Sequence, residues 1–219
     1  MRYRIGVVAV AFAPAGIAES AERARALGFE HLDCAAGPLD ALAEEERDAL
    51  VLPIGDVFGV TASRPRATTL APVERRGEDR FDDAVALFRS MPGVRMEPGP
   101  HTAAGSIEKI EALVAAVPGL RLTLDTGHVA YWGEDPVRAL RYADHVQLRQ
   151  SAKGDAQRHA DEGGDVDFSA VLRELDRLDY QGLLSVEYFD LPSFGWPLED
   201  PVGYSVALAA HVRGLMRAA

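Results

Sequence analysis

The chain has 219 residues, of which 47% are apolar, and its 34 acidic and 23 basic side chains give a net charge of −11. That charge argues against a nucleic-acid partner, because binding to phosphates draws its affinity from lysine and arginine. No apolar run approaches the roughly 18 residues of a membrane span, and a single cysteine, Cys34, excludes an internal disulfide and a cysteine-based zinc site. The amino terminus enters a strand pattern without a signal-peptide core, so we expect a cytoplasmic protein with one domain over residues 1–219.

The first half of the chain alternates strand and helix patterns. Ile17, Ala21 and Ala24 recur at helical spacing, and Gly28 stops that helix. Residues 61–78 contain two prolines and a run of threonine and arginine, which predicts a long loop. Altogether we predict strands over residues 3–10, 29–34, 51–60 and 93–97, and helices over residues 17–27, 38–50 and 78–91.

The second half continues the alternation, with Ser106, Asp135 and Asp167 as predicted helix N-caps. We predict strands over residues 121–125, 145–149 and 183–187, and helices over residues 106–117, 136–142, 167–178 and 201–216. This pattern is typical of an α/β fold, a TIM-type (β/α) barrel. The count is seven strands, and we favour a missing βα unit over a strand hidden in residues 61–78.

Several predicted strands end in an oxygen-bearing side chain. Successive side chains point to opposite faces of a strand, so Thr123 and Asp125 lie opposite Leu122 and Leu124. The same parity puts Glu97, Gln147 and Glu187 on polar faces. Such groups meet at the carboxyl ends of barrel strands, where three carboxylates and an amide oxygen suit Mg²⁺ or Mn²⁺, and also Co²⁺ or Zn²⁺. The alternative for any one acid alone is a solvated residue at the end of a strand, which is the commoner case.

Four motifs carry a resemblance to a known family. They are Met96-Glu97-Pro98-Gly99-Pro100, Asp125-Thr-Gly-His128, Asp144-His145-Val146-Gln147 and Leu184-Ser-Val-Glu187-Tyr188. This stretch resembles the xylose-isomerase-like barrel superfamily, which includes sugar isomerases, ketose 3-epimerases, inosose-handling enzymes and hydroxypyruvate isomerases. The resemblance implies one bound divalent metal ion, with Glu97, Asp125, Gln147 and Glu187 as its ligands. Many relatives have histidine where Gln147 stands, whereas hydroxypyruvate-isomerase-like members resemble this chain in using glutamine. Gly99 replaces the histidine of the family's Glu-Pro-His-Pro.

The resemblance also implies substrate contacts. Arg158, or His159 beside it, matches a family arginine or histidine before a Gly-x-Gly turn, although the alignment slips by one residue here. His128 follows a predicted metal ligand and is the third candidate. The alternatives to these substrate contacts are that Arg158 is a surface arginine and that His128 bonds to a backbone carbonyl. Aromatic residues after the strand ends either wall the pocket, pack internally or form a contact in a homo-oligomer: Tyr131, Trp132, Phe189, Phe194 and Trp196.

These parts predict an enzyme of carbohydrate metabolism, a metal-dependent isomerase or epimerase of a small sugar or hydroxy-carbonyl compound. Glu97 and Glu187 would move a proton on opposite faces of a planar ene-diolate. Delivery to the neighbouring carbon gives aldose–ketose isomerisation, and delivery to the same carbon gives epimerisation. The alternatives are a dehydratase of a cyclic polyol ketone, a non-catalytic binding barrel that lost its chemistry with the missing unit, and the superfamily's abasic-site endonuclease. The acidic balance and a total of six histidines disfavour the last.

Overall fold

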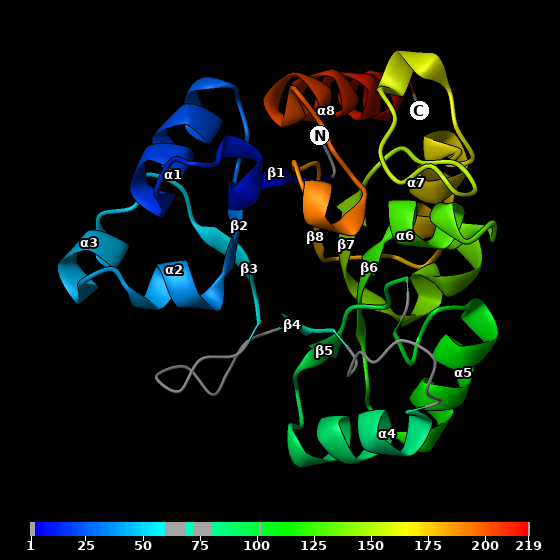
Figure 1. Ribbon diagram of the computed structural model, residues 1–219. Helices are drawn as coiled ribbons and strands as arrows, with labels where there is room; N and C mark the ends of the chain where they lie inside the picture. Colours follow the sequence, from blue (N-terminus) through cyan, green and yellow to red (C-terminus); the bar gives the residue numbers. More distant parts are fainter. Residues whose placement is uncertain (1–2, 60–68, 72–79, 101, 219) are drawn as a thin grey trace.

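A closed barrel of eight parallel strands forms the centre of the protein in a computed structural model, which describes residues 3–59, 69–71, 80–100 and 102–218. Each strand pairs with the next along the chain, and β8 returns to pair with β1. Helices lie around the strands (Figure 1). The predicted α/β fold of the TIM type is therefore confirmed. The strands are β1 Ile5–Val8, β2 Leu32–Ala35, β3 Ile54–Phe58, β4 Thr69–Leu70, β5 Arg95–Met96, β6 Leu122–Asp125, β7 Ala143–Leu148 and β8 Leu183–Val186.

The prediction of a missing βα unit is wrong, because β4 lies within residues 61–78. It pairs with β3 through Phe58 and Thr69, and with β5 through Leu70 and Met96. Thr69 and Leu70 lie in a stretch with two prolines and little alternation of polar and apolar residues, so the sequence favoured a loop there. The remainder of the predicted loop, residues 60–68 and 72–79, lies outside the described residues. The alternative of a non-catalytic binding barrel rested on that missing unit, so it loses its basis.

The helices begin largely where their sequence caps predicted. Ser106 accepts a hydrogen bond from the backbone N–H of Lys109, and Asp135 and Asp167 cap their helices in the same way. No helix among the described residues is long and apolar enough to cross a membrane. The α-helices are α1 Ile17–Ala26, α2 Ala36–Asp40, α3 Glu44–Asp48, α4 Phe81–Ser90, α5 Ile107–Ala116, α6 Thr126–Tyr131, α7 Phe168–Arg177 and α8 Pro201–Ala218, and the 3-10 helices are η1 Ala9–Phe12, η2 Pro136–Tyr142, η3 Ala160–Glu162 and η4 Pro192–Phe194.

Two helical regions differ from the sequence prediction. The helix predicted over residues 38–50 is split into α2 and α3, because the Glu46 side chain accepts the Ala43 N–H at 2.8 Å and so starts a second helix. The helix α6 was not predicted at all. The Asp125 carboxylate accepts the N–H groups of Gly127 and His128, so the last residue of β6 is also the N-cap of α6.

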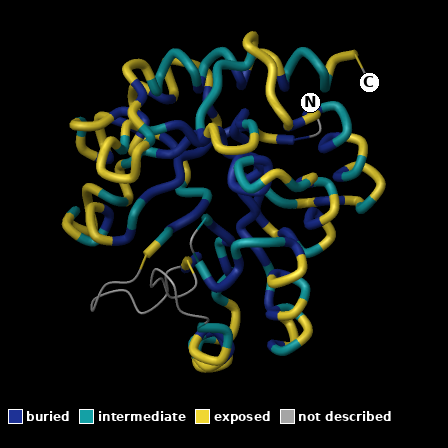
Figure 2. The backbone as a smooth tube through the Cα atoms, turned by 45° about the vertical axis from the view of Figure 1, so that its right-hand side comes forward, coloured by how far each residue is buried: buried dark blue, intermediate teal, exposed yellow. Residues whose placement is uncertain are grey.

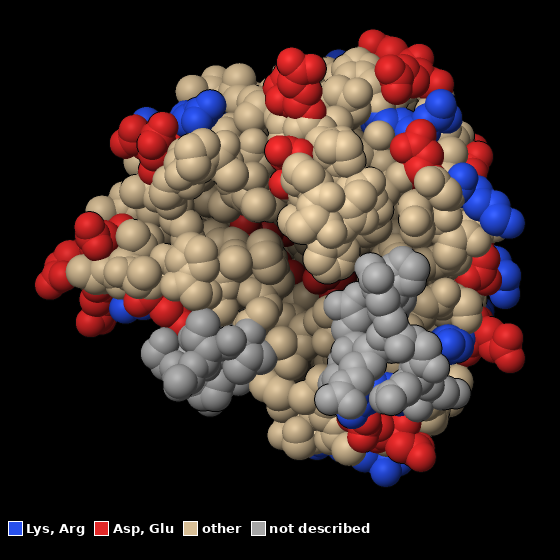
Figure 3. Space-filling model, viewed as in Figure 1, with Lys and Arg blue, Asp and Glu red and all other residues tan. Residues whose placement is uncertain are grey.

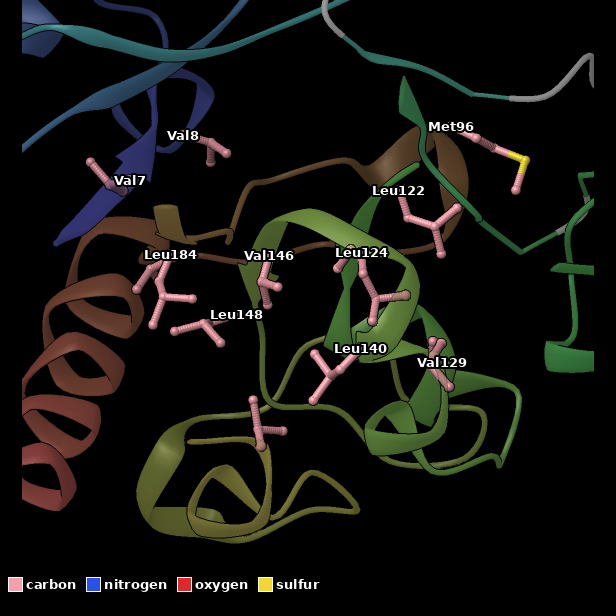
Figure 4. Packing of buried hydrophobic residues seen from close by; sticks show 14 of the residues in the cluster. Val7, Val8, Met96, Leu122, Leu124, Val129, Leu140, Val146, Leu148 and Leu184 are labelled. Atoms are coloured by element: carbon pink, nitrogen blue, oxygen red, sulfur yellow. The ribbon is translucent and has the colours of Figure 1, made fainter. Parts of the chain in front are cut away.

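The outward faces of the strands form the apolar core between the barrel and its helices. Leu122, Leu124, Val146 and Leu184 are fully buried there, and Figure 4 shows them packed together with Leu140 of η2. Each such side chain stabilises the fold by about 1.5–3 kcal/mol. Figure 2 shows the central strands as the most continuously buried part of the chain. The apolar half of the predicted alternation is therefore confirmed.

The inward faces carry a network of buried polar side chains. Arg95 donates to Asp56 Oδ1 at 2.6 Å and to Thr123 Oγ1 at 3.0 Å, which joins β3, β5 and β6 across the barrel. On the other side, His145 Nε2 lies 2.7 Å from Asp33 Oδ2. The Arg95–Asp56 and His145–Asp33 contacts link strands that are not neighbours, so these side chains must point into the barrel. They form a rigid polar floor beneath the strand ends.

Candidate active site

Asp125 is the most firmly held acid at the carboxyl ends of the strands. Its Oδ1 accepts the Gly127 N–H at 2.7 Å, so the cap of α6 fixes the carboxylate and directs Oδ2 toward the barrel axis. Oδ2 pairs with Nη2 of Arg149 and lies 3.5 Å from Nε2 of His128. Burial alone would raise the pKa of Asp125, but the positive charge of Arg149 outweighs it and lowers this pKa below its usual range. Asp125 is therefore an ionised carboxylate at neutral pH.

Arg149 is a fully buried cation among these acids. It lies two residues after Gln147 on β7, on the same inward face, and its Nη2 is 3.8 Å from Oε2 of Glu187. The rings of Phe189 and Trp196 lie over its guanidinium, with the carbon Cζ 5.1 and 5.5 Å from their centres. The arginine thus supplies positive charge to a site that otherwise gathers acids.

Glu97 and Glu187 resist ionisation. Burial, the negative charge of Asp125 and that of Asp56 raise the pKa of Glu97 to about 8. Burial and the charge of Asp125 raise the pKa of Glu187 well above its usual range. Both glutamates are therefore able to hold a proton near neutral pH, as groups that exchange protons with a substrate must.

The two glutamates line the same cavity, which has a volume of about 480 Å³. Its other described walls are mostly apolar and come from the segment after β1, including Val10, Pro14 and Ile17, and from Phe189 after β8. Figure 3 shows acidic side chains on the floor of a hollow in this face. A cavity of this size can hold a small organic molecule.

Gln147 is paired in register with Asp125 on β6 and is buried. Its Oε1 has no hydrogen-bond donor among the described residues. A buried amide oxygen without a donor is costly, so this oxygen is free to bind a ligand.

His128 lies beside the acids but is tied to the backbone. Its Nδ1 donates to the carbonyl of Pro98 at 2.9 Å, which links the start of α6 to the residue after Glu97. Burial lowers the pKa of His128 to about 4. The neutral ring therefore has Nε2 without a proton, close to Asp125. The hydrogen bond from His128 to a backbone carbonyl, one of the two alternatives from the sequence, is present. A substrate contact through Nε2 stays a prediction.

The other two predicted substrate contacts lie away from the carboxylates. The Arg158 side chain pairs with Asp155, with Nε 3.1 Å from Oδ2, and His159 accepts the Asp161 N–H through Nδ1 at 3.3 Å. The His159 ring packs edge-on against Tyr204 of α8. The structure therefore groups His128 with the acids and leaves Arg158 and His159 in the loop before α7, where their predicted roles stay predictions.

Two features of the site were not identified from the sequence. Arg149 shares the parity of Gln147, which was the available signal, but an arginine at the end of a strand usually reaches solvent. The apolar wall after β1 includes Val10, Pro14 and Ile17, which were assigned from the sequence to the end of a strand, to no element and to the start of a helix. Among the described residues, no three carboxylate, imidazole or thiol side chains stand ready to hold a metal ion as they are placed. The guanidinium of Arg149 lies among them instead.

Comparison with known proteins places this geometry in context. The sequence profile of the xylose isomerase-like TIM barrel family matches residues 9–210. The structure is similar to 3-keto-D-glucoside 4-epimerase from E. coli, with 17% identity, a TM-score of 0.69 and coverage of 97% of this chain and 99% of that one. It is also similar to D-psicose 3-epimerase from Clostridium cellulolyticum H10, determined with D-tagatose, with 15% identity, a TM-score of 0.71 and coverage of 97% and 99%.

A third similar structure is a probable 3-DHS dehydratase from Bacillus anthracis, with 14% identity, a TM-score of 0.66 and coverage of 99% of both chains. At these identities the likeness establishes the fold. No curated protein matches the sequence.

Proposed function

Because the chain belongs to the xylose isomerase-like TIM barrel family, we propose that it is a divalent-metal-dependent isomerase or epimerase of a small sugar or hydroxy-carbonyl compound. One observation carries the proposal: Glu97 and Glu187, which directly follow β5 and β8, line one cavity of about 480 Å³ and both have raised pKa values. A pair of carboxyls in this state is suited to moving a proton on and off carbon.

The residues at the strand ends fit a divalent ion by their donor chemistry. Glu97, Asp125 and Glu187 supply carboxylate oxygens, and Gln147 supplies a buried amide oxygen that has no donor among the described residues. Such a set suits Mg²⁺ or Mn²⁺, and also Co²⁺ or Zn²⁺. A bound ion would polarise the carbonyl of a substrate and so acidify the neighbouring carbon.

The proton movement falls to the two glutamates. One glutamate in its ionised form removes the proton from the carbon beside the carbonyl, and the other in its protonated form returns a proton. Return to the same carbon from the opposite face inverts it, whereas return to the carbonyl carbon interconverts ketose and aldose. The mostly apolar walls of the cavity would exclude water from the ene-diolate between the two steps.

The similar structures support this chemistry without deciding it. Two of them are epimerases of keto-sugars by name, and the third is named as a probable dehydratase. Proton removal beside a carbonyl begins all three reactions, so a shared set of groups serves each of them. We favour the isomerase or epimerase because two carboxyls able to hold protons flank one cavity.

Deuterium exchange tests the proposal. Purified protein supplied with Mn²⁺ is incubated in D₂O with D-tagatose, D-allulose and hydroxypyruvate, and the compounds are recovered for mass spectrometry and NMR. We expect deuterium at a carbon beside the carbonyl of at least one compound and no loss of water. A product lighter by one water would favour the dehydratase, and the absence of both exchange and water loss across the set would contradict the proposal.

A further inference from the structure

Arg149 is placed where the proposed metal ion would have to bind. Its Nη2 pairs with Asp125 Oδ2 and lies 3.8 Å from Glu187 Oε2, so one nitrogen stands between two carboxyls that the proposed site needs. A guanidinium and a divalent ion that share Asp125 Oδ2 repel each other, because both are cations at one oxygen. Binding of the ion is therefore favoured when this nitrogen leaves.

The guanidinium is held only in part. Nε and Nη1 of Arg149 have no hydrogen-bond partner among the described residues. Arg95, deeper in the barrel, differs, because its Nε and Nη2 donate to Thr123 and Asp56. Two buried donors without acceptors cost free energy, so a position that pairs them would compete with the present one.

The rings that hold the guanidinium also lead toward the cavity. The guanidinium already stacks on Phe189 and Trp196, and Phe189 lines the cavity next to Glu187. A movement along these rings would keep the cation–π contacts while releasing Asp125 and Glu187. The freed nitrogens would then face a bound substrate as donors to its oxygens.

We propose that Arg149 is an internal counter-ion that competes with the divalent metal for Asp125 and Glu187 and is displaced when the metal binds. This inference rests on the proposed function and adds a regulatory contact to it. The arginine keeps the acids neutralised without metal, at the expense of metal affinity. After displacement it becomes a binding group at the cavity.

Calorimetric titration with Mg²⁺ tests the competition without reference to turnover. We expect Arg149→Met to bind one Mg²⁺ per chain at least tenfold more tightly than the wild type, because the competing cation is gone. Arg121→Met is the matched control, since Arg121 precedes β6, pairs with Asp144 and lies at the opposite end of the strand from Asp125. It removes the same charge and should change the affinity less than threefold.

Fluorescence gives a second readout in the unaltered protein. Trp132 and Trp196 are the only tryptophans, and only Trp196 has Arg149 over its ring among the described contacts. Mg²⁺, which does not quench by itself, should therefore change the emission of the wild type. The change should disappear in Trp196→Phe and in Arg149→Met.

Three outcomes separate this inference from the proposed function. Tighter binding by Arg149→Met together with the fluorescence change supports the displacement. One Mg²⁺ bound with equal affinity by wild type and Arg149→Met, or binding without any change in Trp196 emission, overturns the displacement and leaves the proposed function standing. Absence of binding in both proteins overturns both.

Discussion

The guanidinium of Arg149 pairs with the carboxylate of Asp125 from the neighbouring strand, and both side chains are fully buried. Within the same cluster Glu97 and Glu187 have raised pKa values, whereas the pKa of Asp125 is lowered. Neighbouring acids are thus divided into one fixed anion and two groups that can carry a proton. Asp125 serves as the anchor in our account, and the glutamates serve as the acid and the base.

We predict that Glu187→Gln lowers turnover by about 10²–10⁴-fold, because the amide keeps the size of the side chain but cannot take up a proton. Circular dichroism should show an unchanged fold. Glu199→Gln is the control, because Glu199 is an exposed glutamate in the segment that joins β8 to α8, where Glu187 also lies. Steady-state assays on the compound found by deuterium exchange provide the measurement. Near-normal turnover of Glu187→Gln would remove this residue as a proton carrier.

Gln147 offers a test of the ligand set that does not need a substrate. Since its Oε1 has no donor among the described residues, Gln147→Leu should weaken Mn²⁺ binding while leaving thermal stability almost unchanged. Gln147→His should shift the preference from Mg²⁺ toward Co²⁺ and Zn²⁺, because imidazole suits borderline metals. Calorimetric titration of the three proteins measures both effects. Equal Mn²⁺ affinity of wild type and Gln147→Leu would exclude this residue from the site.

The sequence predicted most of the barrel because the signals are local. Alternation along a strand assigned Asp125 and Glu187 to the inward face, and capping residues such as Ser106 marked the starts of helices. Two kinds of feature escaped. Strand β4 lies in a stretch with two prolines and little alternation. The burial of Arg149 depends on Phe189 and Trp196, which approach it only in the folded chain. Contacts between residues far apart in the chain cannot be predicted from a local sequence pattern.

We predict an acid-sensitive contribution to stability from His31 inside the barrel. Burial lowers the pKa of this histidine to about 4, whereas in the unfolded chain it is about 6.5. Between pH 6.5 and pH 4 the unfolded chain therefore binds a proton at His31 that the folded chain does not bind. This contribution to stability is complete above pH 6.5 and is lost as the pH falls toward 4. The slope from this one group is at most about 1.4 kcal/mol per pH unit.

Urea unfolding at intervals between pH 7 and pH 4.5 measures that slope. His31→Gln keeps a polar group for Ser185 Oγ, which lies 2.8 Å from His31 Nε2 in the wild type. The variant should lose unfolding free energy less steeply with acid than the wild type does. Parallel curves for the two proteins would show that His31 does not titrate as described.

A glycine of β1 makes room for the same histidine. A Cβ atom at Gly6 would overlap the ring of His31, whereas a Cβ at Gly16 would have no atom within 4 Å. We therefore expect Gly6→Ala to destabilise the protein by about 1–3 kcal/mol, the usual effect of overpacking a core. Gly16→Ala is the matched control and should change stability by much less. Equal unfolding midpoints of the two variants in urea would contradict the packing described for the barrel interior.

The central claim is that side chains 97, 125, 147 and 187 hold one divalent ion between them. Titration of the protein with Mn²⁺, followed by electron paramagnetic resonance of the free ion, measures this most directly. We predict one Mn²⁺ bound per chain by the wild type and at least a hundredfold weaker binding by Asp125→Asn. No bound Mn²⁺ in the wild type, or equal binding by the two proteins, would contradict the account.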